Sequence, residues 1–146
     1  MNSQEIRRTL NRICRENFIG VFACDNLPKH LPPRRPLMIV ANTDKHNQPG
    51  QHWISIYIGR EGELSEYFDS MGMPPPMNFE NFLNKFASEW LYNDCKLQSV
   101  LSHFCGHYCI MFCVLKKSMY TMFEIISCFT DDTMLNDTVA HKFICG

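Results

Sequence analysis

Three stretches of the chain cluster apolar residues in the way that strands of a buried sheet do. Groups of prolines at 31–36 and 74–76 bracket these stretches and mark the ends of regular structure. The stretches are rich in β-branched and aromatic residues and occupy 36–43 (PLMIVANT), 52–59 (HWISIYIG) and 64–70 (LSEYFDS). A short glycine-containing connection, REGEL, separates the second from the third. Because this connection has hairpin length, we predict that these two strands are antiparallel neighbours in one sheet.

Beyond residue 77 the apolar spacing changes to that of helices. The residues with helical spacing are Phe79, Phe82, Leu83, Phe86 and Trp90. Asn78 is the predicted cap of this helix. Residues 95–102 fit a short strand or a loop, and residues 106–117 fit a helix that is apolar on almost every side. Two further helices are predicted at 118–129 and 136–144. The pattern therefore predicts an α+β fold in which a small mixed or antiparallel sheet packs against a central helix.

Length and composition limit the kind of protein. The chain has 146 residues, 45% of them hydrophobic, so we expect one domain over residues 1–146. The first residues carry too many charges for a secretory signal, and the longest apolar run, 108–115, is too short to span a membrane. We therefore expect neither secretion nor membrane association. The eight cysteines then lie in a reducing compartment, where thiols serve packing, metal binding or catalysis.

Charge is unevenly distributed along the chain. The net charge is −1, yet residues 1–36 contain seven basic and three acidic residues. Any attraction to nucleic acid would come from this quarter of the chain. The candidate contacts are the arginines of a predicted N-terminal helix and of the loop KHLPPRRP: Arg7, Arg8, Arg12, Arg15, Arg34 and Arg35. A solvated helix face and a proline-stiffened connector are the plainer interpretation, and the sequence favours them.

The sequence SHFCGHYCIMFC, residues 102–113, contains three cysteines and two histidines. Cys105, Cys109 and Cys113 recur every four residues, so on a helix their Cβ atoms lie roughly 5–6 Å apart on one face. Disulfides need Cβ atoms about 3.5–4.5 Å apart, which disfavours a bridge within this helix. The sequence contains no C-x-x-C motif either. A dithiol redox site is therefore excluded.

Zinc binding is a second interpretation of the same stretch, because histidine and cysteine alternate from His103 to Cys109. Structural zinc sites usually take paired ligands from two separated turns of chain, and the pattern offers no evident second pair. We therefore predict no metal site. Cys109 and Cys113 are interpreted as small apolar residues of a buried helix.

Cys105 differs from the other two because it lies at the start of the predicted helix, next to Gly106. The positive end of the helix dipole lowers the pKa of a thiol, and glycine lets a substrate approach the backbone. A thiolate nucleophile also needs an imidazole partner, and the imidazole needs a carboxylate or amide to orient it. His52 opens one strand of the predicted hairpin and Asp69 ends the other, so both can meet at one sheet edge. We predict a Cys105–His52–Asp69 triad.

The ordered motifs GQHW, YFDSMG, Gln98 and CGHYC resemble those of the adenovirus-type cysteine endopeptidases, the adenain family, with its Polinton/Maverick and adintovirus-like relatives. His52 precedes Asp69 by seventeen positions and Gln98 precedes Cys105 by seven, a spacing typical of that family. The resemblance covers residues 17–115. It implies a papain-like protease core of the type shared with ubiquitin-like-protein proteases. It also implies that Cys105 is the nucleophile, His52 the general base and then acid, Asp69 the orienting group and Gln98 an oxyanion donor.

The resemblance implies a biological setting as well. It implies a monomeric thiol endopeptidase that cleaves viral capsid or core precursors at glycine-containing sites, in the host nucleus and the virion. Trp53 would pack beside His52, and Gly106 would support the substrate. The chemistry requires no cofactor, but family members are activated by DNA or a viral peptide, so the arginines would be cofactor contacts. The C-terminus is shorter than in adenovirus enzymes, and Cys95 lies nearer to Gln98 than their peptide-tethering cysteine does.

Two alternatives stay open. A ubiquitin-like-protein deconjugating protease shares the HWISIYI and YFDSMG patterns, but such enzymes usually have an acid where this chain has Phe104. A non-catalytic or zinc-stabilised binding module is the alternative of another class. The presence of all four predicted catalytic positions favours an enzyme over that module.

Overall fold

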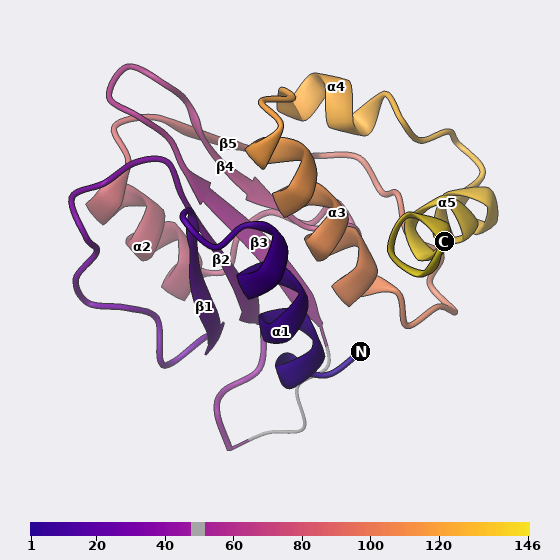
Figure 1. The fold of residues 1–146 in the computed structure, drawn as a ribbon, viewed down its shortest axis with the longest axis horizontal. Coiled ribbons are helices and arrows are strands. Elements are labelled where there is room, and N and C mark those ends of the chain that lie inside the picture. Colours follow the sequence, from indigo (N-terminus) through magenta and orange to yellow (C-terminus); the bar gives the residue numbers. More distant parts are fainter. Residues whose placement is uncertain (48–51) are drawn as a thin grey trace.

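A five-stranded mixed sheet forms the centre of the protein, as Figure 1 shows for the computed structural model. The structure describes residues 1–47 and 52–146, so Gly50 and Gln51 of the GQHW motif lie outside the described residues. The strands follow chain order across the sheet: β1 (Phe18–Ala23), β2 (Leu37–Asn42), β3 (Trp53–Ile58), β4 (Ser65–Phe68) and β5 (Trp90–Tyr92). The two outer pairs are parallel and the two inner pairs antiparallel. The predicted β3–β4 hairpin is thereby confirmed.

Helices cover both faces of this sheet (Figure 1). They are α1 (Ser3–Ile13), α2 (Met77–Phe86), α3 (Cys105–Lys117), α4 (Met122–Ile126) and α5 (Thr133–Cys145). α2 packs alone on one face, whereas α1, α3, α4 and α5 share the core on the other. None of the helices among the described residues is long and apolar enough to cross a membrane. The predicted α+β fold is confirmed.

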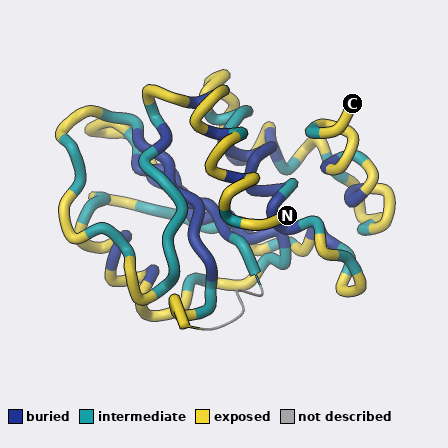
Figure 2. The backbone as a smooth tube through the Cα atoms, turned by 60° about the horizontal axis from the view of Figure 1, so that its bottom comes forward, coloured by how far each residue is buried: buried dark blue, intermediate teal, exposed yellow. Residues whose placement is uncertain are grey.

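The inner strands are buried on both faces, which explains their nearly continuous apolar sequences. In β2, Leu37 and Ile39 point toward α2, while Met38 and Val40 point toward α3. Figure 2 shows the buried backbone of β2, β3 and α3 running through the middle of the molecule. A one-residue shift in register would exchange these two sets of side chains between two differently shaped cores.

α3 is the central helix that the sequence predicts. It packs against β3 on one side and against α1, α4 and α5 on the others, so it is buried along most of its length. Phe112 stacks on Phe68 of the sheet with ring centroids 4.7 Å apart. Cys109 and Cys113 are buried in this core, and burial raises the pKa of both thiols. They are packing residues, as expected.

The sheet has two strands more than the sequence pattern predicts. β1 is a half-buried edge strand, and its pairing with β2 shifts register at Gly20, so it shows no clean alternation. β5 has three residues and pairs with β4. The prediction that Trp90 continues the helix of α2 is wrong, because Ala87 has an extended backbone and ends that helix. Trp90 follows Phe86 by four residues, which is a helical spacing, although the helix has already ended between them.

The boundaries of three helices also differ from prediction. Pro76, not Asn78, holds the cap position of α2, and the Asn78 side chain donates to the carbonyl of Cys24 instead. α4 is confined to five residues rather than spanning 118–129, and Thr121 and Glu124 form the capping box that starts it. α5 starts earlier than residue 136, because Asp132 accepts hydrogen bonds from the first backbone N–H groups of that helix.

Candidate active site

Cys105 is the first residue of α3, and its thiol lies beside the backbone of Trp53 at the start of β3. It is 8% exposed, so its thiol is largely shielded from water. Phe104 precedes the helix and has no side-chain acceptor with which to cap it. The first backbone N–H groups of α3 are therefore available to a negative charge beside Cys105.

His52 and Asp69 meet at the end of the β3–β4 hairpin. His52 directly precedes β3 and Asp69 directly follows β4, and the register pairs Ser55 with Phe68. The Nε2 atom of His52 lies 2.6 Å from Oδ1 of Asp69. The two side chains are 21% and 5% exposed, so this bond is mostly shielded from solvent. With Nε2 hydrogen-bonded to the carboxylate, Nδ1 is the nitrogen left to take a proton.

The Asp69 carboxylate is itself held in place. Its Oδ1 also accepts the backbone N–H of Met71 at 2.8 Å. The buried Asn93 side chain clamps the Asp69 backbone, because its Oδ1 accepts the Asp69 N–H at 2.8 Å and its Nδ2 donates to the Asp69 carbonyl at 2.6 Å. The sequence prediction missed Asn93. It lies 24 positions from Asp69 in a chain segment with no motif, so nothing local signals the contact.

The electrostatics of the site favour a thiolate paired with an imidazolium. Burial lowers the pKa of His52, but hydrogen bonds with Asp69 and Cys105 outweigh it and raise that pKa to about 9. Burial raises the pKa of Cys105, but the hydrogen bond with His52 and the Trp53 backbone N–H outweigh it and hold the pKa below its ordinary value. The pair is therefore charged in a pH range where an ordinary thiol is protonated.

Gln98 lies beside this pair with its side-chain amide fixed in one orientation. It is 3% exposed and lines the same cleft as Cys105. Ser70 donates its hydroxyl to Oε1 of Gln98 at 2.6 Å, and Nε2 donates to the carbonyl of Ser102 at 3.1 Å. Ser70 was also missed, although it directly follows Asp69 in the YFDSMG motif. Because Ser70 binds Oε1 of Gln98, the Nε2 donor of the amide faces the side of the cleft.

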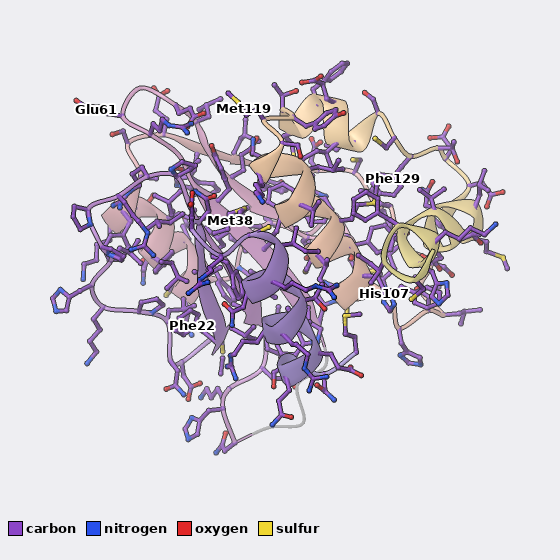
Figure 3. All side chains as sticks on the ribbon, in the orientation of Figure 1. Phe22, Met38, Glu61, His107, Met119 and Phe129 are labelled. Carbon is purple, nitrogen blue, oxygen red and sulfur yellow. The ribbon has the colours of Figure 1, made fainter. Side chains whose placement is uncertain are left out.

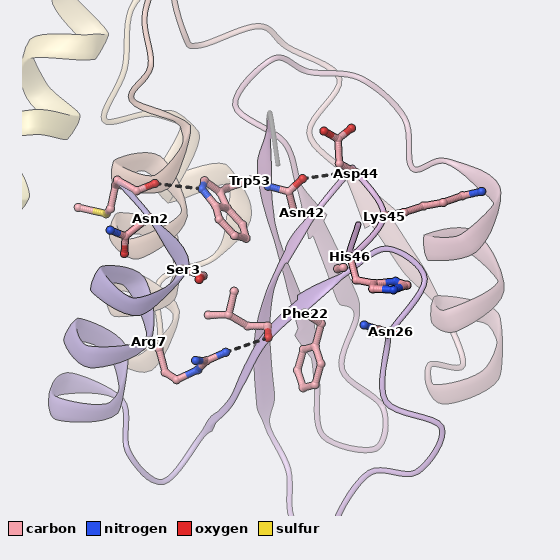
Figure 4. A pocket seen from close by; sticks show the side chains of 13 residues that line it. Asn2, Ser3, Arg7, Phe22, Asn26, Asn42, Asp44, Lys45, His46 and Trp53 are labelled. Atoms are coloured by element: carbon pink, nitrogen blue, oxygen red, sulfur yellow. Dashed lines mark hydrogen bonds between the residues drawn. The ribbon is translucent and has the colours of Figure 1, made fainter. Parts of the chain in front are cut away.

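The cleft at Cys105 has a volume of about 310 Å³. Its lining residues are Met1, His52, Trp53, Met71, Gln98, Ser99, Val100, Ser102, His103 and Cys105. A second hollow of about 470 Å³ runs between α1 and the strands β1 and β2, and it shares Met1 and Trp53 with the cleft (Figure 4). Trp53 donates its indole N–H to the Met1 carbonyl at 3.3 Å. A Cβ atom at position 106 would lie 3.2 Å from Cβ of Met1, so a side chain there would crowd Met1.

The arginines that the sequence singles out lie on α1 and in the loop before β2, except Arg15, which lies in the exposed turn after α1. Three of them bind backbone carbonyls: Arg7 that of Val21 (Figure 4), Arg34 that of Glu16 and Arg35 that of Pro32. Arg8 and Arg12 are exposed. These contacts are structural, and a role in DNA binding stays a prediction.

No protein-family model matches the chain. A segment of 48 residues, 33% of the chain, is 35% identical to a predicted thiol protease, R355, of Acanthamoeba polyphaga mimivirus, of which it covers 16%. The solved ASFV pS273R protease superposes with a TM-score of 0.68 at 18% identity, over 96% of this chain and 66% of that one. SUMO protease Ulp1 with its catalytic cysteine oxidised to a sulfinic acid gives 0.55 at 13% identity, over 99% and 77%. The chain therefore has the Ulp1-like cysteine protease fold.

Proposed function

We propose that this chain is a thiol endopeptidase whose nucleophile is Cys105. The hydrogen bond between His52 and Asp69, formed beside the thiol at the start of α3, is the observation that carries this proposal. A buried imidazole oriented by a carboxylate and facing a helix-terminal thiol is the arrangement that activates a cysteine nucleophile. The fold shared with the ASFV protease and with Ulp1 supports the same assignment.

The reaction has two halves in this geometry. The thiolate of Cys105 attacks the carbonyl carbon of the scissile peptide, and the His52 imidazolium then gives its proton to the departing amine. A thioester to Cys105 remains. His52 next removes a proton from water, which attacks the thioester and releases the acid product and the thiol. Asp69 holds the imidazole with Nδ1 toward the reacting atoms.

The oxyanion formed in each half would be stabilised by Gln98 and by the backbone N–H of Cys105. The Nε2 group of Gln98 is a buried donor that Ser70 holds in orientation. A preorganised donor of this kind contributes about 2.7–4 kcal/mol to transition-state stabilisation. In the described structure Nε2 donates to the Ser102 carbonyl, so substrate binding would redirect this hydrogen bond toward the oxyanion.

Viral capsid or core precursors cleaved at glycine-containing sites are the proposed substrates. Glycine specificity rests on the resemblance of the four ordered motifs to the adenovirus-type endopeptidases. The neighbouring hollow between α1 and the strands β1 and β2, which shares Met1 and Trp53 with the cleft, offers room for residues upstream or downstream of the scissile bond. We extend the proposal to action in the host nucleus and the virion, with DNA or a viral peptide as activator.

The first test needs no substrate. At about pH 6 an ordinary thiol with a pKa near 8.5 is well under ~1% thiolate, whereas a thiolate–imidazolium pair is already ionised. Alkylation of the purified protein followed by mass spectrometry is therefore expected to label Cys105 at least roughly 10-fold faster than the exposed Cys128. In His52→Ala this preference should disappear, because burial alone raises the pKa of Cys105.

His30→Ala, at an exposed histidine far from β3 in sequence, is the matched control and should retain fast labelling. Equal, slow labelling of Cys105 and Cys128 in the unmodified protein would contradict a preformed ion pair. Repeating that measurement with duplex DNA present separates an inactive site from one that awaits an activator.

Gln98→Ala is expected to lower kcat for a glycine-containing peptide by about 10²–10³-fold, because one oxyanion donor is lost. Alkylation of Cys105 at about pH 6 should stay fast, since Gln98 does not hold the imidazole. Gln4→Ala, at an exposed glutamine of α1, is the control. A drop of less than roughly threefold, or an equal loss of alkylation, would remove Gln98 from the oxyanion role.

A panel of substrates separates this proposal from the deconjugase alternative. A thiol endopeptidase should cleave internal glycine-containing sites in peptides, with products identified by mass spectrometry. Release of a reporter only from the C-terminus of a folded ubiquitin-like protein would favour the deconjugase instead.

A further inference from the structure

We propose that His107, His141 and Cys145 form a Zn²⁺ site that ties α5 to α3, away from the cleft at Cys105. One nitrogen from each imidazole and the sulfur of Cys145 all lie within 4.8 Å of one another. His107 belongs to α3, whereas His141 and Cys145 belong to α5, and Figure 3 shows His107 where these two helices meet. This is the one such group of three found in 1–47 and 52–146.

The donor set suits zinc. His141 and Cys145 are four positions apart on α5, so their side chains project from the same face of the helix. Two imidazoles and a thiolate are ligands that Zn²⁺ binds, leaving a fourth position for water. Ligand atoms in a tetrahedral zinc site lie roughly 3.3–3.8 Å apart. Side-chain rotations that move the ligand atoms by about 1 Å would bring the three to these distances. His141 and Cys145 are exposed, which gives the ion a path of entry.

The His107 imidazole provides a second, independent indication. Its Nδ1 atom is shielded from solvent, and among the described residues it has no hydrogen-bond partner. Buried polar atoms nearly always have one. The ring packs edge-on against Phe104 and at 5.4 Å from the ring of His141, so it is fixed toward α5 without a polar contact. A cation held by this ring and by α5 accounts for an imidazole in such a position.

The site also completes the attachment of α5. The N-terminal half of α5 is already bound by hydrogen bonds, since Tyr108 donates to Asp137 at 2.8 Å and Asn136 donates to the Leu97 carbonyl at 3.0 Å. His141 and Cys145 lie one and two turns farther along the same helix. Zinc would therefore fasten the C-terminal half of α5 to the helix that carries Cys105.

The predicted absence of a metal site rested on the alternating residues of 102–113 and on the lack of an evident second pair of ligands, and it overlooked His141 and Cys145. In the structure His103 and Cys105 line the cleft, and Cys109 lies in the core, so that set does not converge. The partners of His107 lie 34 and 38 positions farther along the chain. A spacing of that kind is set by how α5 packs on α3, which the local pattern does not encode.

The test uses the full chain carrying Cys105→Ala, so that the thiol of the cleft cannot bind the metal. Zn²⁺ binding is measured by competition with a chromophoric chelator, and Co²⁺ is added separately as a spectroscopic probe. We expect one equivalent of Zn²⁺, a cobalt–thiolate charge-transfer band, and a rise in Tm on adding Zn²⁺. Hydrogen exchange should slow in residues 140–146 on binding.

Adding Cys145→Ser or His141→Ala should weaken Zn²⁺ binding by at least about 100-fold and remove the cobalt–thiolate band or shift it. Cys128→Ser and His30→Ala are the matched controls and should bind as before. Equal affinity with and without Cys145, a missing thiolate band, or less than half an equivalent bound would each overturn the proposal. None of these readouts depends on peptidase activity, so the zinc site and the proposed function fail or stand separately.

Discussion

Cys105→Ala is expected to lower kcat for peptide hydrolysis by about 10⁶-fold. In the proposed mechanism the thiolate of Cys105 is the group that forms a covalent bond to the substrate. Alanine removes only the sulfur atom, and Cys105 lies at the end of α3, so the core beneath it should keep its packing. Turnover of a glycine-containing fluorogenic peptide measures the loss, and circular dichroism checks the fold.

Cys128→Ala is the matched control, since Cys128 is exposed and lies outside the helices. It should retain the activity of the unmodified chain within about twofold. Substantial turnover by Cys105→Ala, or equal losses in both variants, would show that a different group carries the reaction.

The inner part of the fold was predictable because its signals are local. β2 and β3 have both faces buried and are apolar almost throughout, and α3 is apolar on almost every side because most of its length is buried. The short link between β3 and β4 fixes an antiparallel pair. That pair is what brings His52 and Asp69 together, so their contact followed from turn length and strand ends alone.

The rest of the site depends on contacts across long stretches of chain. Asn93 reaches Asp69 from the loop after β5, and Ser70 reaches Gln98 over 28 positions. β5 itself has only three residues and exists because β4 offers a free edge to pair with. Tertiary contacts decide such features, and periodicity in the sequence carries no record of them.

Residues of α3 contact the cleft, the core and α5, because successive residues of a helix point in different directions. Cys105 opens the helix at the cleft, and Cys109 and Cys113 on the same side descend into the core against β3. His107 and Tyr108 turn toward α5 instead. The helix that begins with the proposed nucleophile is therefore also the helix against which α5 packs.

Asp69→Ala is expected to lower kcat by about 10⁴-fold. Without the carboxylate the buried imidazole of His52 loses its main stabilising partner, so its pKa falls and the charged pair with Cys105 is disfavoured. Alkylation of Cys105 at about pH 6 should slow in parallel. The Asp69 backbone keeps its hydrogen bonds with Asn93, so the end of the hairpin should hold its shape.

The kcat of Asp69→Asn should lie between that of the original chain and that of Asp69→Ala. Oδ1 accepts both His52 Nε2 and the Met71 N–H, and the Met71 bond would keep the carbonyl end of an asparagine amide facing the imidazole. The tautomer with Nδ1 free to accept a proton would then survive, and only the negative charge would be lost. Asp94→Ala, at the exposed neighbour of Asn93, is the control. An Asp69→Ala variant within about tenfold of the original turnover would show that His52 is oriented by another group, and Asp69→Asn as inactive as alanine would show that charge outweighs orientation here.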